Sequence, residues 1–172
     1  EVFGGKAPRD LQLADPQWYA AQGIRLLLSS AVEVLDLAER RLQTCHGETY
    51  SYDRLVLATG SYPFVPPIPG HERAGCYVYR TLSDLDAIRD ACAGGRTGVV
   101  VGGGLLGLEA ANALRLLGLE THVVEFAPRL MPVQLDPVGG DLLKNKIESL
   151  GVQVHVNTAT ECIVDGESAR HR

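Results

Sequence analysis

The second half of the chain shows the clearest pattern of apolar and polar positions, because short apolar runs alternate with longer segments of helical spacing. Three runs predict strands, at 98–101, 121–125 and 152–156. Two segments between them predict helices, at 105–117 and 137–150. Gly118 and Gly151 follow the helices where C-terminal caps are expected. Strand–helix alternation of this kind indicates an α/β fold with a Rossmann-like parallel sheet.

The first sixty residues contain shorter elements. Asp15-Pro16, with Gly23 further on, predicts a short capped helix. A β-hairpin is predicted from 31–37 and 41–44, with a further strand at 49–52. Two apolar runs predict additional strands, at 24–28 and 54–60. The second run ends in small residues and is typical of a strand buried on both faces.

The middle of the chain reads as a connection. Four of the nine prolines lie between 61 and 70, which predicts an extended crossover or linker. A helix is expected to start within 81–84 and to run to about Ala93, with Ser83 and Asp86 as its N-cap pair. We therefore divide the sequence into residues 1–94 and residues 95–172.

Composition and charge narrow the choice of partner. The net charge is −5 and basic residues form no run, so nucleic acid is not expected as a partner. The apolar runs are far too short to span a bilayer. The first residues lack the basic head and apolar block of a signal peptide, so a cytoplasmic protein is expected. The chain has no initiator methionine and is expected to be a piece of a longer protein.

Metal and disulfide chemistry is not predicted. The four cysteines are too far apart for a CxxC motif, which weighs against a redox pair and a zinc site. The histidines lack the HxxxH and HExxH spacings of metal sites. His122 and His155 fall within predicted strands and are expected at edge or surface positions.

One motif carries chemistry. An apolar strand leads into GxGxxG at Gly102, Gly104 and Gly107. Gly102 would allow a tight turn, Gly104 would let a pyrophosphate approach the backbone, and Gly107 would let the helix pack close to the strand. The helix N-terminus, which includes Leu105 and Leu106, would offer N–H groups and partial positive charge to the phosphates. The alternative is a glycine-rich turn without a ligand.

An acidic residue supports a dinucleotide. Glu125 ends the next predicted strand, 18 residues after Gly107. Its carboxylate could accept hydrogen bonds from both ribose hydroxyls and would repel a 2′-phosphate, which favours NADH over NADPH. Arg129, four residues on, could soften that preference. The glycines alone leave FAD open as the ligand.

Five segments in a fixed order carry a family resemblance. They are LVLATGS at 55–61, PPIPG at 66–70, YRTLSD at 79–84, VVGGGLLGLEAA at 100–111, and PRLMP with QLD at 128–136. Together they resemble the FAD-dependent pyridine nucleotide–disulfide oxidoreductase superfamily over almost the whole chain. Within it, the sequence is most similar to the flavoprotein part of NAD(P)H nitrite reductase large subunits. Rubredoxin and ferredoxin reductases are near relatives.

The resemblance implies site residues and domains. Ala58-Thr59-Gly60 would run beside FAD, and Arg80 would lie near the return into the nicotinamide domain. The glycine motif and Glu125 would hold the ADP half of NADH. Glu109 would lie where nicotinamide meets flavin, although a first-turn acid favoured by the helix dipole is the alternative. Residues 1–94 would then be a partial FAD-binding domain with its linker, and 95–172 a C-terminally truncated NAD(H)-binding domain.

The implied function is electron transfer. NADH would pass hydride to FAD, and electrons would go on to an acceptor domain or protein, with nitrite as the final acceptor. No side chain would need to act as acid or base. The FAD fingerprint of the superfamily is not found before residue 60. A second hypothesis is therefore an NADH-binding module without turnover, and a third is part of a rubredoxin or ferredoxin reductase.

Overall fold

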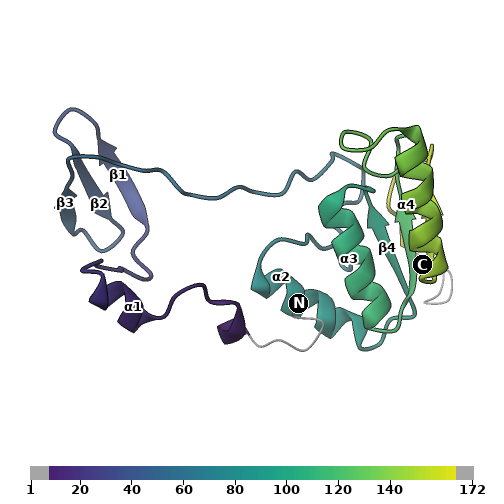
Figure 1. Ribbon diagram of the computed structural model, residues 1–172, viewed down its shortest axis with the longest axis horizontal. Coiled ribbons are helices and arrows are strands. Elements are labelled where there is room, and N and C mark those ends of the chain that lie inside the picture. The colour runs from purple at the N-terminus through teal and green to yellow at the C-terminus, as the bar shows by residue number, and fades with distance from the viewer. Residues whose placement is uncertain (1–7, 166–172) are drawn as a thin grey trace. The chain divides into compact units, whose positions relative to one another are not determined.

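The computed structural model describes residues 8–165, and contacts along the chain divide these between Ser61 and Tyr62 into two units (Figure 1). Of the described residues, one unit holds 9–61, and the other holds 62–165 together with Pro8. A short 3-10 turn, η2, spans Pro8–Leu11.

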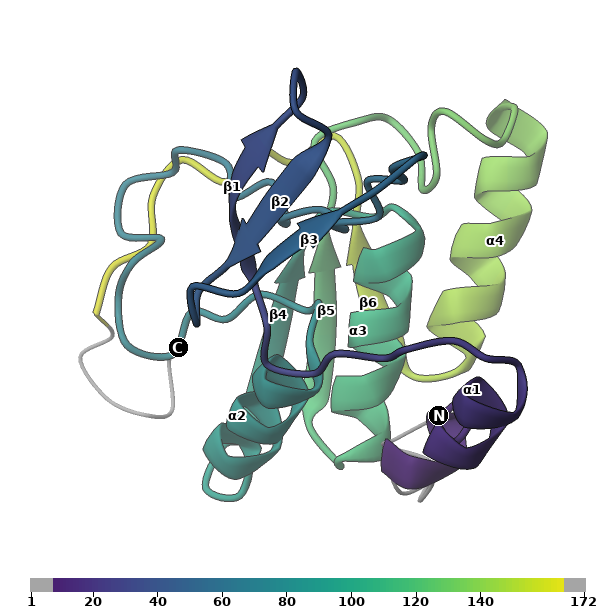
Figure 2. The same ribbon diagram turned by 90° about the vertical axis from the view of Figure 1, so that its left-hand side faces the viewer.

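Three parallel strands form the sheet of the 62–165 unit (Figure 2). They are β4 (Thr97–Val101), β5 (Glu120–Val124) and β6 (Val152–His155), in that order across the sheet. Residue Val101 is in register with Val124, and Val124 is in register with His155. The carboxyl ends of all three strands therefore meet at one edge, and the predicted α/β fold with a parallel sheet is confirmed.

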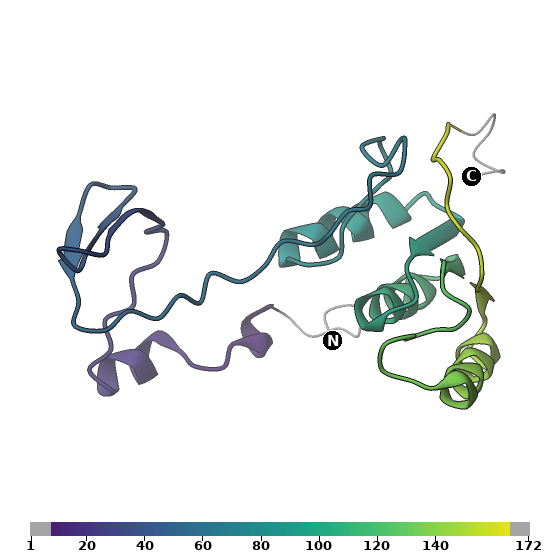
Figure 3. The same cartoon turned by 90° about the horizontal axis from the view of Figure 1, so that it is seen from above.

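Helices α3 (Leu105–Leu116) and α4 (Pro137–Ser149) cover one face of this sheet (Figure 3). The buried core lies between these helices and the sheet. It consists of Ala111, Val123, Leu130, Val152 and Val154. Both helices end where the sequence predicts, because Gly118 (φ +85°) and Gly151 (φ +90°) adopt the left-handed conformation just past them.

The opposite face of the sheet is open in the described residues. Val99 and Val101 of β4 are 53% and 46% exposed, whereas Val123 on the helix-covered face is fully buried. Alternation along each strand explains the difference, since neighbouring side chains point to opposite faces. The predicted surface position of His122 and His155 matches their place on this open face.

Helix α2 (Leu82–Cys92) precedes β4 and begins with a different cap from the one predicted. Thr81 is the N-cap residue: its hydroxyl accepts a hydrogen bond from the Asp84 N–H at 3.2 Å, and the Asp84 carboxylate accepts one from the Thr81 N–H at 2.7 Å. Ser83 already lies inside the helix, so the predicted Ser83–Asp86 pair was wrong. Extended backbone at Thr81 (ψ 165°) places its side chain for capping, and helical backbone does not.

The 9–61 unit contains a short helix and an antiparallel sheet. Helix α1 (Pro16–Ala21) is capped by Asp15, whose carboxylate accepts a hydrogen bond from the Trp18 N–H at 2.7 Å. Strands β1 (Val32–Asp36), β2 (Arg41–Thr44) and β3 (Thr49–Ser51) pair in that order. The predicted helix, hairpin and third strand are confirmed. The three strands make up the predicted β segment.

Two predicted strands in this unit are absent. Residues 24–28 and 54–60 have no strand structure, and Val56 and Leu57 are 84% and 70% exposed. A strand buried on both faces needs neighbours that supply hydrogen bonds and cover. None of the described strands pairs with either run. Apolar composition alone therefore led to the wrong prediction.

The crossover segment groups with the parallel-sheet unit, although the sequence places a domain division at 94/95. The Ile163 N–H donates to the Pro69 carbonyl at 2.8 Å, and Arg73 forms an ion pair with Asp165. Gly70 (φ +88°) lies so close to the Ile163 carbonyl that an added Cβ would overlap it. These contacts join residues before the sheet to residues after it. The division at 94/95 stays a prediction about domains.

Within residues 8–165, every helix is too short or too polar to cross a membrane.

The α2 cap yields a test. Thr81→Ala should lower the free energy of unfolding by about 1 kcal/mol, because a side-chain cap is lost. Ser83→Ala, at the position the sequence favoured, should change it by less than about 0.5 kcal/mol. Denaturant unfolding measures both. Equal effects of the two variants would contradict the assigned cap.

The same cap should respond to acid. Hydrogen bonds from Thr81, first from its backbone N–H and then from its side chain, hold the pKa of Asp84 below its usual range. The folded state therefore favours the carboxylate. This stabilisation is present above the ordinary pKa of aspartate and is lost as the pH falls through the lowered value. Asp84→Asn should remove that part of the acid dependence of unfolding.

Candidate functional site at the glycine-rich loop

The glycine loop joins β4 to α3 through a tight turn. Gly102 has φ +112°, and its N–H donates to the Val124 carbonyl at 2.8 Å. A left-handed backbone of this kind is readily adopted only by glycine. Gly107, on the first turn of α3, faces this turn so closely that an added Cβ would overlap the Gly102 carbonyl oxygen. The geometry matches the tight turn and close packing expected of these two glycines.

Gly104 has open space in front of it. It is the N-cap residue of α3, and an added Cβ would meet no other atom within 4 Å. The helix has no side-chain cap, whereas α1, α2 and α4 are capped by Asp15, Thr81 and Asp136. The first N–H groups of α3, including those of Leu105 and Leu106, thus have no side-chain acceptor. Together with the helix dipole they suit an anion such as a pyrophosphate.

Glu125 follows β5 and reaches the glycine loop. Its Oε2 accepts a hydrogen bond from the Gly103 N–H at 2.6 Å, and its Oε1 accepts one from the Ala127 N–H at 2.7 Å. Both oxygens of the partly buried carboxylate are therefore held by the backbone. Each retains acceptor capacity for a further hydroxyl group. The structure thus brings Glu125 and the glycine motif together.

Gly103 was missed by sequence reasoning, which treated it as a variable position of the motif. An added Cβ there would lie 2.5 Å from Cδ2 of Leu130 and 3.1 Å from Cβ of Glu125. Only glycine lets Leu130 and Glu125 approach the loop this closely. The signal available in the sequence was the unbroken triple glycine at 102–104.

Arg129 is engaged within its own loop. Its Nε donates to the Leu135 carbonyl at 3.0 Å, and its Nη2 donates to the Pro132 carbonyl, also at 3.0 Å. Its aliphatic part packs on α4, where an added Cβ at Gly140 would lie 2.9 Å from Cβ of Arg129. Sequence reasoning considered this guanidinium as a partner for a 2′-phosphate, but its hydrogen bonds are directed to main-chain carbonyls.

Tyr79, the residue before Arg80, is influenced by the charge of Glu109 on α3. Burial raises the pKa of Tyr79, and the negative charge of Glu109 raises it further. Glu109 is the fifth residue of α3 and lies on its second turn. The first turn of α3 contains no acidic residue, so the first-turn reading of Glu109 was wrong, and its role as a cofactor contact stays a prediction.

The remaining predicted site residues belong to the other unit. Ala58, Thr59 and Gly60 lie in the 9–61 unit, and Gly60 has φ +74°. Their assignment to FAD stays a prediction.

A histidine pair lies on the open face of the sheet, and the His155 carbonyl accepts a hydrogen bond from the N–H of Glu125 at 2.8 Å. Nδ1 of His122 is 3.0 Å from Nε2 of His155, and the two rings are stacked with centroids 5.3 Å apart. Residues 8–165 contain no cluster of three or more His, Cys, Asp or Glu side chains suited to a metal. The four cysteines, all within this range, are free thiols.

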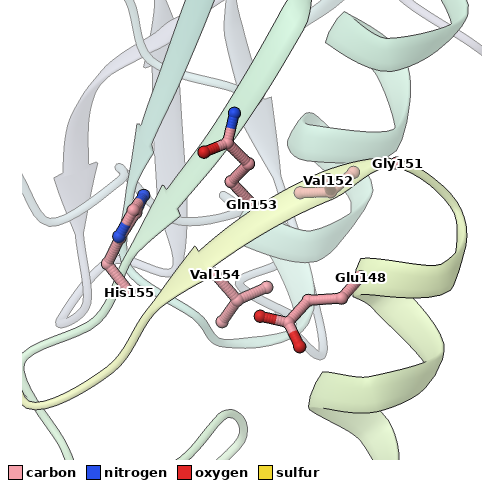
Figure 4. A pocket seen from close by; sticks show the side chains of 6 residues that line it. All are labelled: Glu148, Gly151, Val152, Gln153, Val154 and His155. Carbon is pink, nitrogen blue, oxygen red and sulfur yellow. The ribbon is translucent and has the colours of Figure 1, made fainter.

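A hollow of about 370 Å³ runs along the edge strand β6 (Figure 4). It is lined by Glu148 from α4 and by residues 151–155. None of these is a predicted cofactor-binding residue. The candidate site is therefore defined by the loop geometry, and this hollow is not part of it.

Comparison with known families gives a match over nearly the whole chain. The family model of the pyridine nucleotide-disulphide oxidoreductases matches residues 6–171. The nitrite reductase [NAD(P)H] large subunit of Klebsiella oxytoca is 55% identical, over 97% of this chain and 18% of that protein. The nitrite reductase (NADH) large subunit of Escherichia coli K12 is 46% identical, over 98% of this chain and 20% of that protein. The chain thus spans about a fifth of the length of these relatives.

Solved structures share the fold. A ferredoxin reductase from Rhodopseudomonas palustris aligns with a TM-score of 0.83 and 30% identity, over 95% of this chain and 40% of that one. The water-forming NADH oxidase from Lactobacillus brevis, bound to NADH, aligns with a TM-score of 0.81 and 25% identity, over 96% and 38% of the two chains. An engineered variant of that oxidase with five substitutions, bound to NADPH, aligns with the same TM-score of 0.81.

Two glycine substitutions should separate ligand binding from folding. Gly104→Val points into open space and should lower the free energy of unfolding by no more than about 1 kcal/mol, because valine is a poorer N-cap residue than glycine. It should nevertheless abolish dinucleotide binding, because the side chain would occupy the expected pyrophosphate position. Gly107→Ala should cost about 1–3 kcal/mol of stability, because the methyl group forces α3 away from the turn. Thermal unfolding and dinucleotide titration measure the two effects. Undiminished binding by Gly104→Val would contradict the site.

Proposed function

The chain belongs to the pyridine nucleotide-disulphide oxidoreductase family, and we propose that it binds the ADP half of NADH within a flavoprotein that passes electrons from NADH through FAD to an acceptor. The observation that carries this proposal is the Glu125 carboxylate, held at the glycine loop by the N–H groups of Gly103 and Ala127. A fixed carboxylate beside an anion-binding helix N-terminus suits a ribose next to a pyrophosphate.

The residues present fit this ligand. The open position at Gly104 and the uncapped start of α3 would receive the pyrophosphate. The free acceptor capacity of Glu125 would receive the ribose hydroxyls. Because the carboxylate is negatively charged, it would disfavour the 2′-phosphate of NADPH. Arg129, whose Nε and Nη2 donate to two carbonyls of its own loop, offers that phosphate little compensation.

The Lactobacillus oxidase and its variant support this choice of cofactor. Among the five substitutions in the NADPH-bound variant are a glycine and an aspartate that stand 18 positions apart. Gly107 and Glu125 have the same spacing in this chain. In the variant an arginine also replaces the residue directly after the aspartate. The residue directly after Glu125 in this chain is Phe126, which is 79% exposed.

The flavin side of the proposal rests on the family. When bound, NADH would supply a hydride and FAD would accept it, so the cofactors would carry the redox chemistry. We assign Ala58, Thr59 and Gly60 to the FAD region, and Arg80 and Glu109 to the approach of nicotinamide to flavin. We keep 1–94 and 95–172 as the FAD-side and NADH-side segments. No side chain of this chain is given an acid or base role.

The acceptor of the whole protein is proposed from its relatives. Two nitrite reductase large subunits, at 55% and 46% identity, favour nitrite as the final acceptor, reached through a further electron-acceptor domain or protein. Ferredoxin reductases of this fold make a ferredoxin-type acceptor the alternative. A cytoplasmic setting is supported by the four free thiols.

A second candidate function concerns the 172-residue chain by itself. The run 54–60, which includes the proposed FAD residues, has no strand structure in the described unit, and Val56 and Leu57 are largely exposed. This favours a chain that binds NADH without turnover. A purified chain that is colourless but binds NADH would support the module, and a yellow chain with bound flavin would support a working FAD site.

Cofactor choice can be tested without disturbing Glu125. The chain should bind NADH more tightly than NADPH, and Phe126→Arg should narrow the ratio of the two dissociation constants by about tenfold, which corresponds to about 1.4 kcal/mol. The added cation would attract the 2′-phosphate. Phe126→Gln, which adds no charge, is the matched control. Fluorescence titration measures the constants, and tighter binding of NADPH by the unaltered chain would contradict the role of Glu125.

A further inference from the structure

The loop of residues 126–135, between β5 and α4, lies against the glycine loop. Both backbone groups of Gly103 are bonded from this side of the molecule. Its N–H donates to Glu125 at 2.6 Å, and its carbonyl accepts a hydrogen bond from the Met131 N–H at 3.0 Å. Both the N–H and the carbonyl of Gly103, in the middle of the glycine motif, are therefore fixed by hydrogen bonds. This restricts how the neighbouring Gly102 and Gly104 can move.

The 126–135 loop makes this contact in an unusual conformation. Met131 has φ +47°, the left-handed region that residues other than glycine rarely adopt. Leu130 beside it is fully buried, and its Cδ2 would lie 2.5 Å from a Cβ added at Gly103. The N–H groups of Gln134 and Leu135 both donate to the Met131 carbonyl, at 3.1 and 3.0 Å. A compact turn thus presents the Met131 N–H to the glycine loop.

The Arg129 side chain forms hydrogen bonds to both ends of this turn. Its Nε and Nη2 donate to the carbonyls of Leu135 and Pro132, the two ends of the segment that follows Met131. Its aliphatic part rests on Gly140 of α4, where a side chain would collide with it. The planar guanidinium can reach two carbonyls at once, which a lysine ammonium on a flexible stem cannot reproduce.

We propose that Arg129 is a positioning residue for the dinucleotide: it holds the 126–135 loop so that Met131 and Leu130 fix Gly103, and through Gly103 the phosphate-binding turn. This rests on the proposed function, which supplies the ligand, and adds a role for a residue whose place after the acidic position suggests a phosphate ligand. Arg129 acts on the shared pyrophosphate region and not on the 2′-position that distinguishes the two cofactors.

The two roles predict different results. If Arg129 positions the loop, its loss should weaken NADH and NADPH by the same factor. If Arg129 were a ligand of the 2′-phosphate, its loss would weaken NADPH selectively and change the ratio of the two dissociation constants. If only its positive charge mattered, Arg129→Lys would retain full binding. The ratio and the lysine variant therefore distinguish positioning from direct contact.

The experiment uses the full chain with Arg129→Gln and Arg129→Lys. Both should raise the dissociation constants of NADH and NADPH about tenfold, as expected for lost hydrogen bonds from a charged group, with their ratio unchanged within about twofold. Arg115→Gln, on the surface of α3, is the matched control. A changed ratio, or full binding by Arg129→Lys, would overturn the proposal.

Gly140→Ala provides a second route to the same loop with Arg129 intact. Alanine is the better helix former, so α4 itself should not be weakened. The added methyl group should displace the Arg129 stem and loosen the loop. Amide hydrogen exchange of ligand-free protein should then rise about tenfold at Met131 and Gly103 in this variant and in Arg129→Gln. Gly94→Ala, where a Cβ meets nothing within 4 Å, should leave both amides unchanged.

The exchange measurement also separates this proposal from the proposed function. If the unaltered chain bound neither dinucleotide, the proposed function would fail, and exchange at Met131 and Gly103 would still report whether Arg129 holds the loop. If the unaltered chain bound NADH but the Arg129 and Gly140 variants showed unchanged exchange at both amides, the positioning role would be wrong and the proposed function would stand.

Discussion

The hydrogen bonds between the Glu125 carboxylate and the N–H groups of Gly103 and Ala127 fix the acidic residue of the candidate site to its glycine loop. They join the end of β5 to the turn after β4, at 2.6 and 2.7 Å. A carboxylate serves because both of its oxygens accept, whereas an amide would set an NH2 group against one of the two donors. Glu125 thus shapes the glycine loop through the two hydrogen bonds that it accepts, apart from the ribose contact proposed for it.

The parallel sheet makes this arrangement possible. Because β4, β5 and β6 run in the same direction and in register, their carboxyl ends deliver the glycine loop and Glu125 to one edge. Helix α3 starts at that edge without a side-chain cap, so its N-terminal donors remain for an anion. In such sheets the ligand crevice lies outside the carboxyl ends of the strands. Fold and site are therefore consequences of one topology.

Each glycine of the motif has a different structural explanation. Gly102 and Gly107 are explained by a positive φ and by contact with the preceding turn, and Gly104 by open space. Gly103 has a different reason, because Leu130 and Glu125 press against it. The loop after β5 and the loop after β4 are thus packed on each other. The positioning role proposed for Arg129, which packs against Gly140, would make affinity for a dinucleotide depend on this packing.

Local pattern in the sequence was enough for the order and type of the elements from β4 to β6, for the caps at Gly118 and Gly151, and for the tight turn at Gly102 with the close packing at Gly107. Those features depend on periodicity and on the conformational freedom of single residues, which neighbours in the chain decide. Only the tertiary structure decided the rest. The runs 24–28 and 54–60 looked like strands but have no pairing partner among the described strands, and strand pairing is not a local property. Arg129 could have faced a phosphate, but packing against Gly140 directs its guanidinium to the carbonyls of its own loop, a contact between segments that no local pattern records.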